Sequence, residues 1–231
     1  MAESSIPSVW VREAGRPQGL SRERIVAAAL ELLDAEGLAA LSMRSLGKRL
    51  DAGATSLYRH VANKDELVEL VVDEVYAEVD VRDPSGRWRE DAAEAAGSLR
   101  AMALRHPWVA GVLGQVGLSY LGPNLARASS RMTDLLTAAG FDAGEADRAM
   151  SAIVAFVVGT VTSESAWLAM VARSGKSERE LVESLQEVQA HLNETPAAQE
   201  YDDPAVYRDD SFAFGLDLIL DGLEARLQRK G

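Results

Sequence analysis

The stretch that decides the fold is Ser56-Leu57-Tyr58-Arg59-His60-Val61-Ala62-Asn63-Lys64. Leu57 and Val61 are four residues apart, so they lie on one face of a helix, while polar and basic side chains occupy the positions around them. The pattern predicts a short helix with an apolar inner face and a polar outer face.

A second short helix is expected before this stretch. Ser42 is suited to cap it, and Leu46 and Leu50 supply the apolar face. The small residues Asp51-Ala52-Gly53 between the two helices are typical of a tight turn. Two short helices joined by a tight turn are the layout of a DNA-binding helix-turn-helix.

Longer helices are expected on both sides of this pair. Ser21 caps the first, and Gly37 ends it. Asn63 and Glu66 are placed to form a capping-box-like pair at the start of the other, which is expected to run to about Val79.

Charge is distributed unevenly along the chain. The net charge of the 231 residues is -12, which argues against a protein that covers nucleic acid with its whole surface. Yet residues 1–64 hold nine Lys/Arg and seven Asp/Glu, whereas residues 65–231 hold 15 and 29. Residues 42–64 alone contain five basic residues and one acid. This basic island fits contact with phosphates, although an uneven solvated surface is the simpler alternative.

Residues 20–78 resemble the DNA-binding domain of the TetR family of transcriptional regulators. The resemblance rests on "ALELL" with Glu36-Gly37, on "LSMRSL" from Leu41, and above all on "SLYRHVANKDELV" from Ser56. It implies an all-α protein with an N-terminal three-helix helix-turn-helix domain and a larger C-terminal helical ligand-binding and dimerisation domain. The expected division is a flexible arm over 1–20, the DNA-binding domain over 21–66 and the C-terminal domain over 67–231.

Carried over by position, the resemblance implies a set of DNA-contacting residues at the two short helices and the start of the next one. Guanidinium groups pair well with guanine, and a helix N-terminus attracts phosphate. The candidates are Ser42, Arg44, Ala54, Thr55, Ser56, Tyr58, Arg59, His60 and Lys64. For each of them a local structural role is the alternative: Tyr58 could pack on the following helix, and Arg44 could pair with a nearby acid. In the arm, Arg12 and Arg16 could enter a minor groove or have no role.

Helical spacing also dominates the rest of the chain. We expect helices over about 88–105, 108–119, 124–139, 143–173, 178–193 and 211–229, with a long mobile loop over 194–210. The family resemblance implies that the last long helices pair with a second copy in a homodimer, and that a small-molecule effector binds among the helices. Candidates to line that pocket are Met102, Trp108, Gln115, Tyr120, Phe156, Thr160, Glu164 and Trp167, with Met132 and Met170 beside them. Plain core packing is the alternative for about half of these residues.

Catalytic and metal sites are not expected. The sequence has no cysteine and three histidines, and it lacks the nucleophile-elbow, zincin, P-loop and dinucleotide motifs. The tetracycline-repressor branch of the family binds a magnesium–drug chelate through histidine. The only later histidines here are His106 and His191, and His106 precedes Pro107 at an expected helix end, where no alignment with a metal-binding position is established. We therefore predict no metal, no cofactor and no enzymatic activity.

The chain is expected to be cytoplasmic and to have no membrane partner. Residues 1–20 lack an apolar signal segment, and the longest apolar run, around 152–161, is too short to span a bilayer. The predicted function is a repressor that a small-molecule effector releases from a palindromic operator in double-stranded DNA. Two alternatives stay open: an all-helical ligand- or protein-binding module without DNA binding, and a transcriptional activator.

Overall fold

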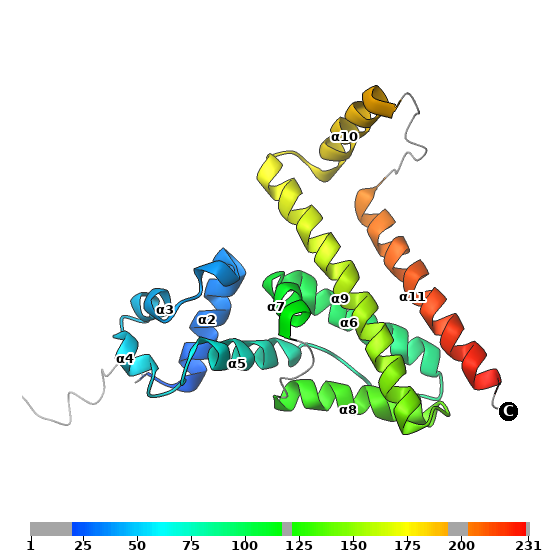
Figure 1. The fold of residues 1–231 in the computed structure, drawn as a ribbon, viewed down its shortest axis with the longest axis horizontal. Helices are drawn as coiled ribbons and strands as arrows, with labels where there is room; N and C mark the ends of the chain where they lie inside the picture. The colour runs from blue at the N-terminus through cyan, green and yellow to red at the C-terminus, as the bar shows by residue number, and fades with distance from the viewer. Residues whose placement is uncertain (1–19, 117–121, 194–202, 230–231) are drawn as a thin grey trace, which may run out of the picture. The chain divides into compact units, whose positions relative to one another are not determined.

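The computed structural model describes residues 20–116, 122–193 and 203–229, which form helices joined by turns (Figure 1). The chain divides into two compact units, Met1–Val71 and Val72–Gly231. Over the described residues the elements run in this order: α2 (Arg22–Glu36), the 3-10 turn η2 (Leu38–Ala40), α3 (Met43–Arg49), α4 (Ala54–Leu57), α5 (Lys64–Tyr76), α6 (Trp88–Arg105), α7 (Trp108–Val116), α8 (Pro123–Ala138), α9 (Ala143–Ser174), α10 (Glu178–Asn193) and α11 (Pro204–Gln228). The predicted all-α fold is confirmed.

Local signals set the start and end of α2. The side chain of Ser21 accepts a hydrogen bond from the backbone N–H of Arg24. Gly37 adopts a φ of 77° and donates its N–H to the carbonyl of Leu33, which ends the helix. The buried face of α2 joins the buried side chains of α3 and α4 in one core: Ile25, Val26, Ala29, Leu32, Leu33, Leu46 and Leu57.

The turn between α3 and α4 packs closely against Gly47 of α3. A Cβ atom there would lie 2.7 Å from the carbonyl oxygen of Ala52, so only glycine permits this approach. Leu46, Leu57 and Val61 are buried as predicted. Leu50, predicted as core, is only half-buried, because it is the C-cap of α3 at the start of the turn.

Helix α5 begins with a side-chain cap and ends earlier than expected. The Oδ1 atom of Asn63 accepts from the N–H of Glu66 at 2.8 Å, and the Glu66 carboxylate accepts in return from the N–H of Ala62. The helix ends at Tyr76 rather than about Val79, because hydrogen bonds to the third preceding residue replace the α-helical pattern over 77–79.

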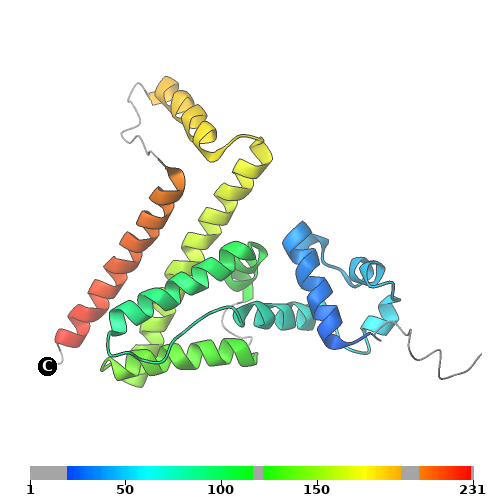
Figure 2. The same ribbon diagram turned by 180° about the vertical axis from the view of Figure 1, so that it is seen from behind.

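In the Val72–Gly231 unit, α9 is the longest helix and packs against α6, α8 and α11. Figures 1 and 2 show α9 extending beyond α8 to the turn that leads into α10. The side chains of Asp142 and Glu145 form a capping box at its start, and Gly175, in the left-handed conformation, ends it.

Helix α11 begins at Pro204, seven residues before the predicted start at Ser211. Asp203 caps it by accepting from the N–H of Ala205 at 2.8 Å, and proline is well suited to the first helical position. The predicted loop over 194–210 is therefore wrong for 204–210, where the proline begins a helix instead of breaking one. Its other part, 194–202, lies outside the described residues.

By length and average composition, α9 could cross a membrane. In the folded unit, however, its Glu164 binds Arg100 of α6 and Arg208 of α11. Its buried residues, such as Ile153, Val157 and Val161, contribute to the core of this unit. These contacts join α9 to its neighbours, while 22% of its most apolar 18-residue stretch is buried within the chain.

Candidate functional site

Helix α4 presents a small polar face to solvent. Ala54 and Thr55 are exposed and Ser56 is half-buried, while Leu57 turns into the core. Directly after the helix, Tyr58 is 52% exposed, so packing on the following helix does not explain it. The predicted major-groove positions are thus accessible to a partner.

The cations predicted to contact DNA are exposed, and the structure gives them no ion pair within its described residues. These exposed cations without an ion pair are Arg44, Arg59 and Lys64. By contrast, Arg49 of the same unit binds Glu31 at 2.9 Å. Cations that are not neutralised by nearby acids are available to bind phosphate or base edges.

Ser42 serves as a helix cap as well as a candidate contact. Its Oγ atom accepts from the N–H of Ser45 at 3.0 Å, and the Oγ atom of Ser45 accepts from the N–H of Ser42 at 3.0 Å. Sequence reasoning missed Ser45 as the second half of this capping box, because serine at that position is less typical than Glu or Gln. The box fixes the start of α3, next to Arg44.

His60 and Lys64 lie around the start of α5. His60 is half-buried, and its backbone carbonyl accepts from Nε of Arg22 at 3.3 Å. The side chain of Arg22 is also 3.9 Å from that of Glu66. Arg22, which the sequence analysis did not single out, therefore ties α2 to the segment that follows α4.

The larger of two notable cavities has a volume of about 560 Å³ and lies among α9, α10 and α11. That volume is within the ~300–1,000 Å³ usual for small-molecule sites. Aromatic rings, hydroxyls and charged groups line it: Phe156, Thr160, Ser163, Glu164, Trp167, Glu178, Pro204, Tyr207, Arg208 and Ser211. Four predicted ligand residues come together here, namely Phe156, Thr160, Glu164 and Trp167.

A charged cluster forms part of this cavity's wall. The buried carboxylate of Glu164 accepts two hydrogen bonds from Arg100, at 2.7 and 2.9 Å, and one from Arg208 at 3.1 Å. Arg208 also binds Glu178, the first residue of α10, which in turn accepts from Nε1 of Trp167. The cluster thereby joins α6, α9, α10 and α11. It brings Arg208 to the cavity wall and Arg100 behind that wall, two arginines that sequence reasoning had missed.

Arg100 is held from several sides. Its guanidinium lies 4.8 Å from the centre of the Phe212 ring and donates to Asp209 at 2.8 Å. Burial lowers the pKa of Arg100, but its hydrogen bonds to Glu164 and Asp209 outweigh that effect and raise the pKa above its usual value. Arg100 is therefore a fixed positive charge behind the cavity.

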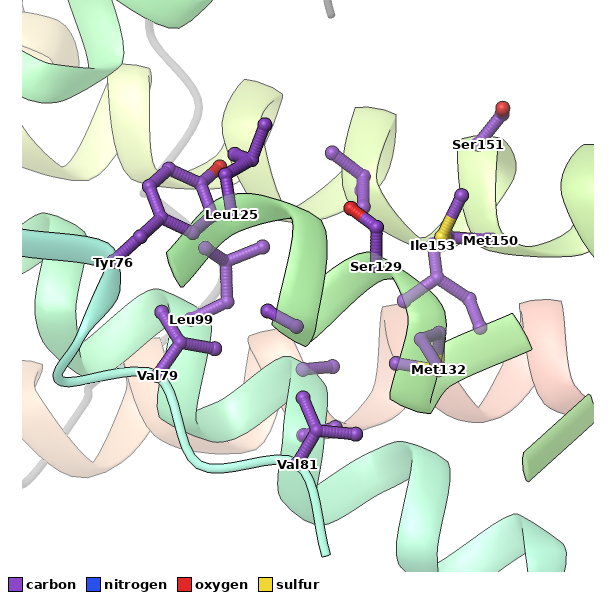
Figure 3. A pocket seen from close by; sticks show the side chains of 14 residues that line it. Tyr76, Val79, Val81, Leu99, Leu125, Ser129, Met132, Met150, Ser151 and Ile153 are labelled. Atoms are coloured by element: carbon purple, nitrogen blue, oxygen red, sulfur yellow. The ribbon is translucent and has the colours of Figure 1, made fainter. Parts of the chain in front are cut away.

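A second cavity, about 50 Å³ in volume, is narrow and almost wholly apolar (Figure 3). Side chains from the end of α5, from the segment after it and from α6, α8 and α9 surround it, among them Tyr76, Val79, Leu99 and Leu125. Tyr76 is 6% exposed, and burial raises its pKa to about 12. Of the predicted pocket residues only Met132 lines this cavity.

Of the other predicted ligand residues, Met102, Trp108 and Met170 line neither cavity. Met102 and Trp108 are buried in the core, Trp108 with its ring edge-on to that of His106. Met170 is 38% exposed. The side chain of Gln115 and all of Tyr120 lie outside the described residues. Within the described ranges no group of three or more His, Asp or Glu residues is placed to hold a metal ion.

Two family models match the chain. The model for bacterial regulatory proteins of the tetR family covers residues 25–71, and the model for the tetracyclin repressor-like C-terminal domain covers residues 82–227. A transcriptional regulator from Saccharopolyspora erythraea is 39% identical over 72% of this chain and 71% of its own length. The transcriptional repressor DrrR1 from Streptomyces coeruleorubidus is 34% identical over 92% of this chain and 80% of its own length.

Solved structures with the same fold include complexes. The Streptomyces coelicolor TetR family protein ActR bound to actinorhodin has a TM-score of 0.76 and 33% identity, over 90% of this chain and 97% of that one. The BioQ protein bound to its double-stranded DNA operator has a TM-score of 0.64 and 25% identity, over 88% of this chain and 98% of that one.

Proposed function

This chain belongs to the tetR family of bacterial regulatory proteins, and we propose that it is a repressor that binds operator DNA as a homodimer and is released by a small-molecule effector. The observation that carries the proposal is the polar surface of α3 and α4. On and beside these helices, Arg44 of α3, Arg59 after α4 and Lys64 at the start of α5 are exposed in a locally basic stretch of an otherwise acidic chain.

For DNA recognition, we assign the base-reading role to Arg44 and to the exposed tip of α4. Arg44 can pair with a guanine through two hydrogen bonds, and the methyl group of Ala54 can contact a thymine methyl. Tyr58, Arg59 and Lys64 would bind phosphates and so fix the position of α4 on the duplex. The complex of BioQ with operator DNA supports a DNA partner for this fold.

For dimerisation, the exposed apolar face of α11 supports pairing with a second copy. Phe214 is 67% exposed and Leu218 is 58% exposed, one helical turn apart. Exposed aromatic and aliphatic side chains grouped in this way are typical of an interface. A palindromic operator needs two recognition helices about 34–36 Å apart, which a homodimer supplies.

For the effector, we assign the larger cavity. Its rings at Phe156, Trp167 and Tyr207 suit a ligand with a planar ring system, and Arg208 suits an acceptor group on that ligand. The ActR complex with actinorhodin supports a small-molecule ligand for this fold. Through linkage, a ligand that prefers the conformation with low DNA affinity releases the operator.

The DNA-binding proposal is tested by gel shift with the promoter beside the chain's own gene. Wild type should retard the fragment specifically, while Arg44→Ala and Tyr58→Ala should weaken binding. One bidentate base contact is worth about 1–3 kcal/mol, and a homodimer loses one in each half-site, so Arg44→Ala should bind about 30-fold less tightly or weaker still. The control Arg148→Ala, an exposed α9 residue, should behave as wild type. Equal retardation by all four proteins would contradict the assignment.

The effector proposal is tested by adding ring-containing compounds, with actinorhodin as the first probe, to the protein–operator complex. A compound that releases the wild type should release Trp167→Ala less readily, because this variant lacks a ring of the cavity. Leu185→Ala, an exposed residue of α10 that does not line the cavity, serves as the control. Equal release of wild type and Trp167→Ala would place the effector elsewhere.

A further inference from the structure

Helix α8 is capped by a residue of another helix. Its own N-cap, Gly122, has no side chain to offer, and the carboxylate of Asp73 from α5 takes that role. The Oδ1 atom of Asp73 accepts from the backbone N–H groups of Asn124 and Leu125 at 2.9 and 3.0 Å. The side-chain amide of Asn124 donates back to the carbonyl oxygen and to Oδ2 of Asp73, each at 3.1 Å. A negative charge at a helix N-terminus is also favoured by the helix dipole.

Glycine at position 122 makes this contact possible. An added Cβ atom would lie 2.2–2.5 Å from the side chain of Asp73, which is closer than any real contact. The φ of Gly122 is -74°, so its backbone conformation would accept any residue. Glycine is therefore needed here for the approach of Asp73 and not for the turn.

Apolar packing beside this contact is incomplete. The narrow cavity of about 50 Å³ lies next to it, with Tyr76, one turn after Asp73, and Leu125 of α8 among its walls (Figure 3). Because protein interiors are close-packed, a cavity at this place means that apolar contacts alone hold the end of α5 less firmly against α8. The hydrogen bonds of Asp73 supply a directional connection there.

We propose that Asp73 is the positioning residue through which α8 sets the position of α5, and we call its contact with the α8 N-terminus the Asp73 latch. This inference rests on the proposed function. Helix α5 is continuous from Lys64, a proposed phosphate contact, to Tyr76. Helix α8 packs against α9, which lines the larger cavity. A ligand that shifts α9 and α8 therefore acts on α5 through the latch.

The test breaks the Asp73 latch by one substitution in α5 and by another at the start of α8. Asp73→Ala removes the carboxylate, and Gly122→Ala forces it away. Each single variant should weaken operator binding on the order of tenfold, within the range usual for coupling between sites. The double variant should lose less affinity than the sum of the two single losses, because both changes break the same hydrogen bonds. It should still bind less tightly than Asp73→Ala, because the Cβ of residue 73 would lie 2.5 Å from the added Cβ at position 122. Hydrogen exchange should speed up at the first turn of α8 and along α5 in the same variants.

Matched controls separate this effect from general destabilisation. Glu74→Ala changes an exposed neighbour on α5, and Gly97→Ala places a Cβ in α6 where nothing lies within 4 Å. Both should bind operator as wild type does. Operator affinity is measured on folded protein well below the unfolding temperature, where a merely structural role would leave it unchanged.

Two results would overturn the inference. The first is an Asp73→Ala protein that is less stable but binds operator as tightly as Glu74→Ala. The second is additive loss in the double variant. If the wild type bound no operator at all, the proposed function would fail, and hydrogen exchange would still decide the latch: unchanged exchange in α5 and α8 of Asp73→Ala would rule it out.

Discussion

Arginines are used in opposite ways in the two units. In the Met1–Val71 unit, Arg44 and Arg59 are exposed and have no ion pair in the described structure. In the Val72–Gly231 unit, Arg100 and Arg208 are bound to carboxylates and connect helices far apart in the sequence. The contrast teaches that an arginine's role here follows from its neighbours. Arg44 and Arg59 have no ion pair in the described structure and are available to a partner, whereas Arg100 and Arg208 are used inside the fold of their own unit.

The strongest effect is expected at the buried charged cluster. Glu164→Gln should destabilise the protein by about 3–5 kcal/mol, because Arg100 and Arg208 lose the buried carboxylate that neutralises them. Urea unfolding measures this change. Asp209→Asn is the control: its carboxylate also binds Arg100 but is 70% exposed, so about 0–1 kcal/mol is expected. A loss at Glu164 no larger than at Asp209 would contradict the structural role of the cluster.

In the Met1–Val71 unit, the largest loss of stability is expected from a substitution in the apolar core and not from the removal of a charge. Leu57→Ala removes a fully buried side chain of α4 and should cost about 2–5 kcal/mol. Operator binding should be lost with it, because α4 has only four residues to hold its position. Thermal unfolding followed by circular dichroism measures the loss of stability, and a gel shift measures the loss of operator binding. A variant that keeps full operator affinity would show that α4 is not the recognition helix.

Two capping boxes give a matched pair across the units. Ser42→Ala removes the cap of α3, and Asp142→Ala removes the cap of α9. Each should lower the free energy of unfolding by about 0.5–2 kcal/mol. Only Ser42→Ala should weaken operator binding, since Ser42 is next to Arg44. Equal operator affinity for the two variants would separate the α3 cap from DNA binding.

The smallest effect is a pH dependence at Glu78. Burial alone would raise its pKa, but hydrogen bonds from His106 and Arg105 outweigh it and hold the pKa below the ordinary value of 4.5. A lowered pKa in the folded state adds stability above pH 4.5, which is lost as the pH falls through the folded-state pKa. The unfolding temperature of wild type should therefore exceed that of Glu78→Gln at pH 6 and approach it near pH 3. A constant difference across that interval would refute the ion pair's contribution.

The sequence predicted the first unit well because its signals are local. Caps at Ser21, Ser42 and Asn63 and the spacing of Leu57 and Val61 define helices within a few residues of each signal. The beginning of α11 was misplaced because Pro204 breaks a helix or begins one depending on the residue before it, and Asp203 is an effective cap.

The larger cavity could be predicted only in part. Four of its residues lie on α9 at helical spacing and were identified from the sequence. Arg208 binds Glu164 across 44 residues and Glu178 across 30 residues, and Arg100 binds Glu164 across 64 residues. No local pattern encodes such pairs. Met102 and Trp108 have the same residue types as a ligand pocket, but their burial in the core is a property of the packed unit.

The central claim is that the exposed cations of α3, of the segment after α4 and of the α5 start bind phosphate and bases. The salt dependence of operator binding tests it most directly. Fluorescence anisotropy with a labelled operator, over a series of salt concentrations, should give a steep loss of affinity for wild type. In a plot of log affinity against log salt concentration, Lys64→Ala should reduce the slope by about 2, because each protomer of the homodimer loses one phosphate contact. Arg148→Ala, from the acidic unit, should leave the slope unchanged. An unaltered slope in Lys64→Ala would contradict the phosphate contact, and affinity independent of salt would contradict the account of this surface.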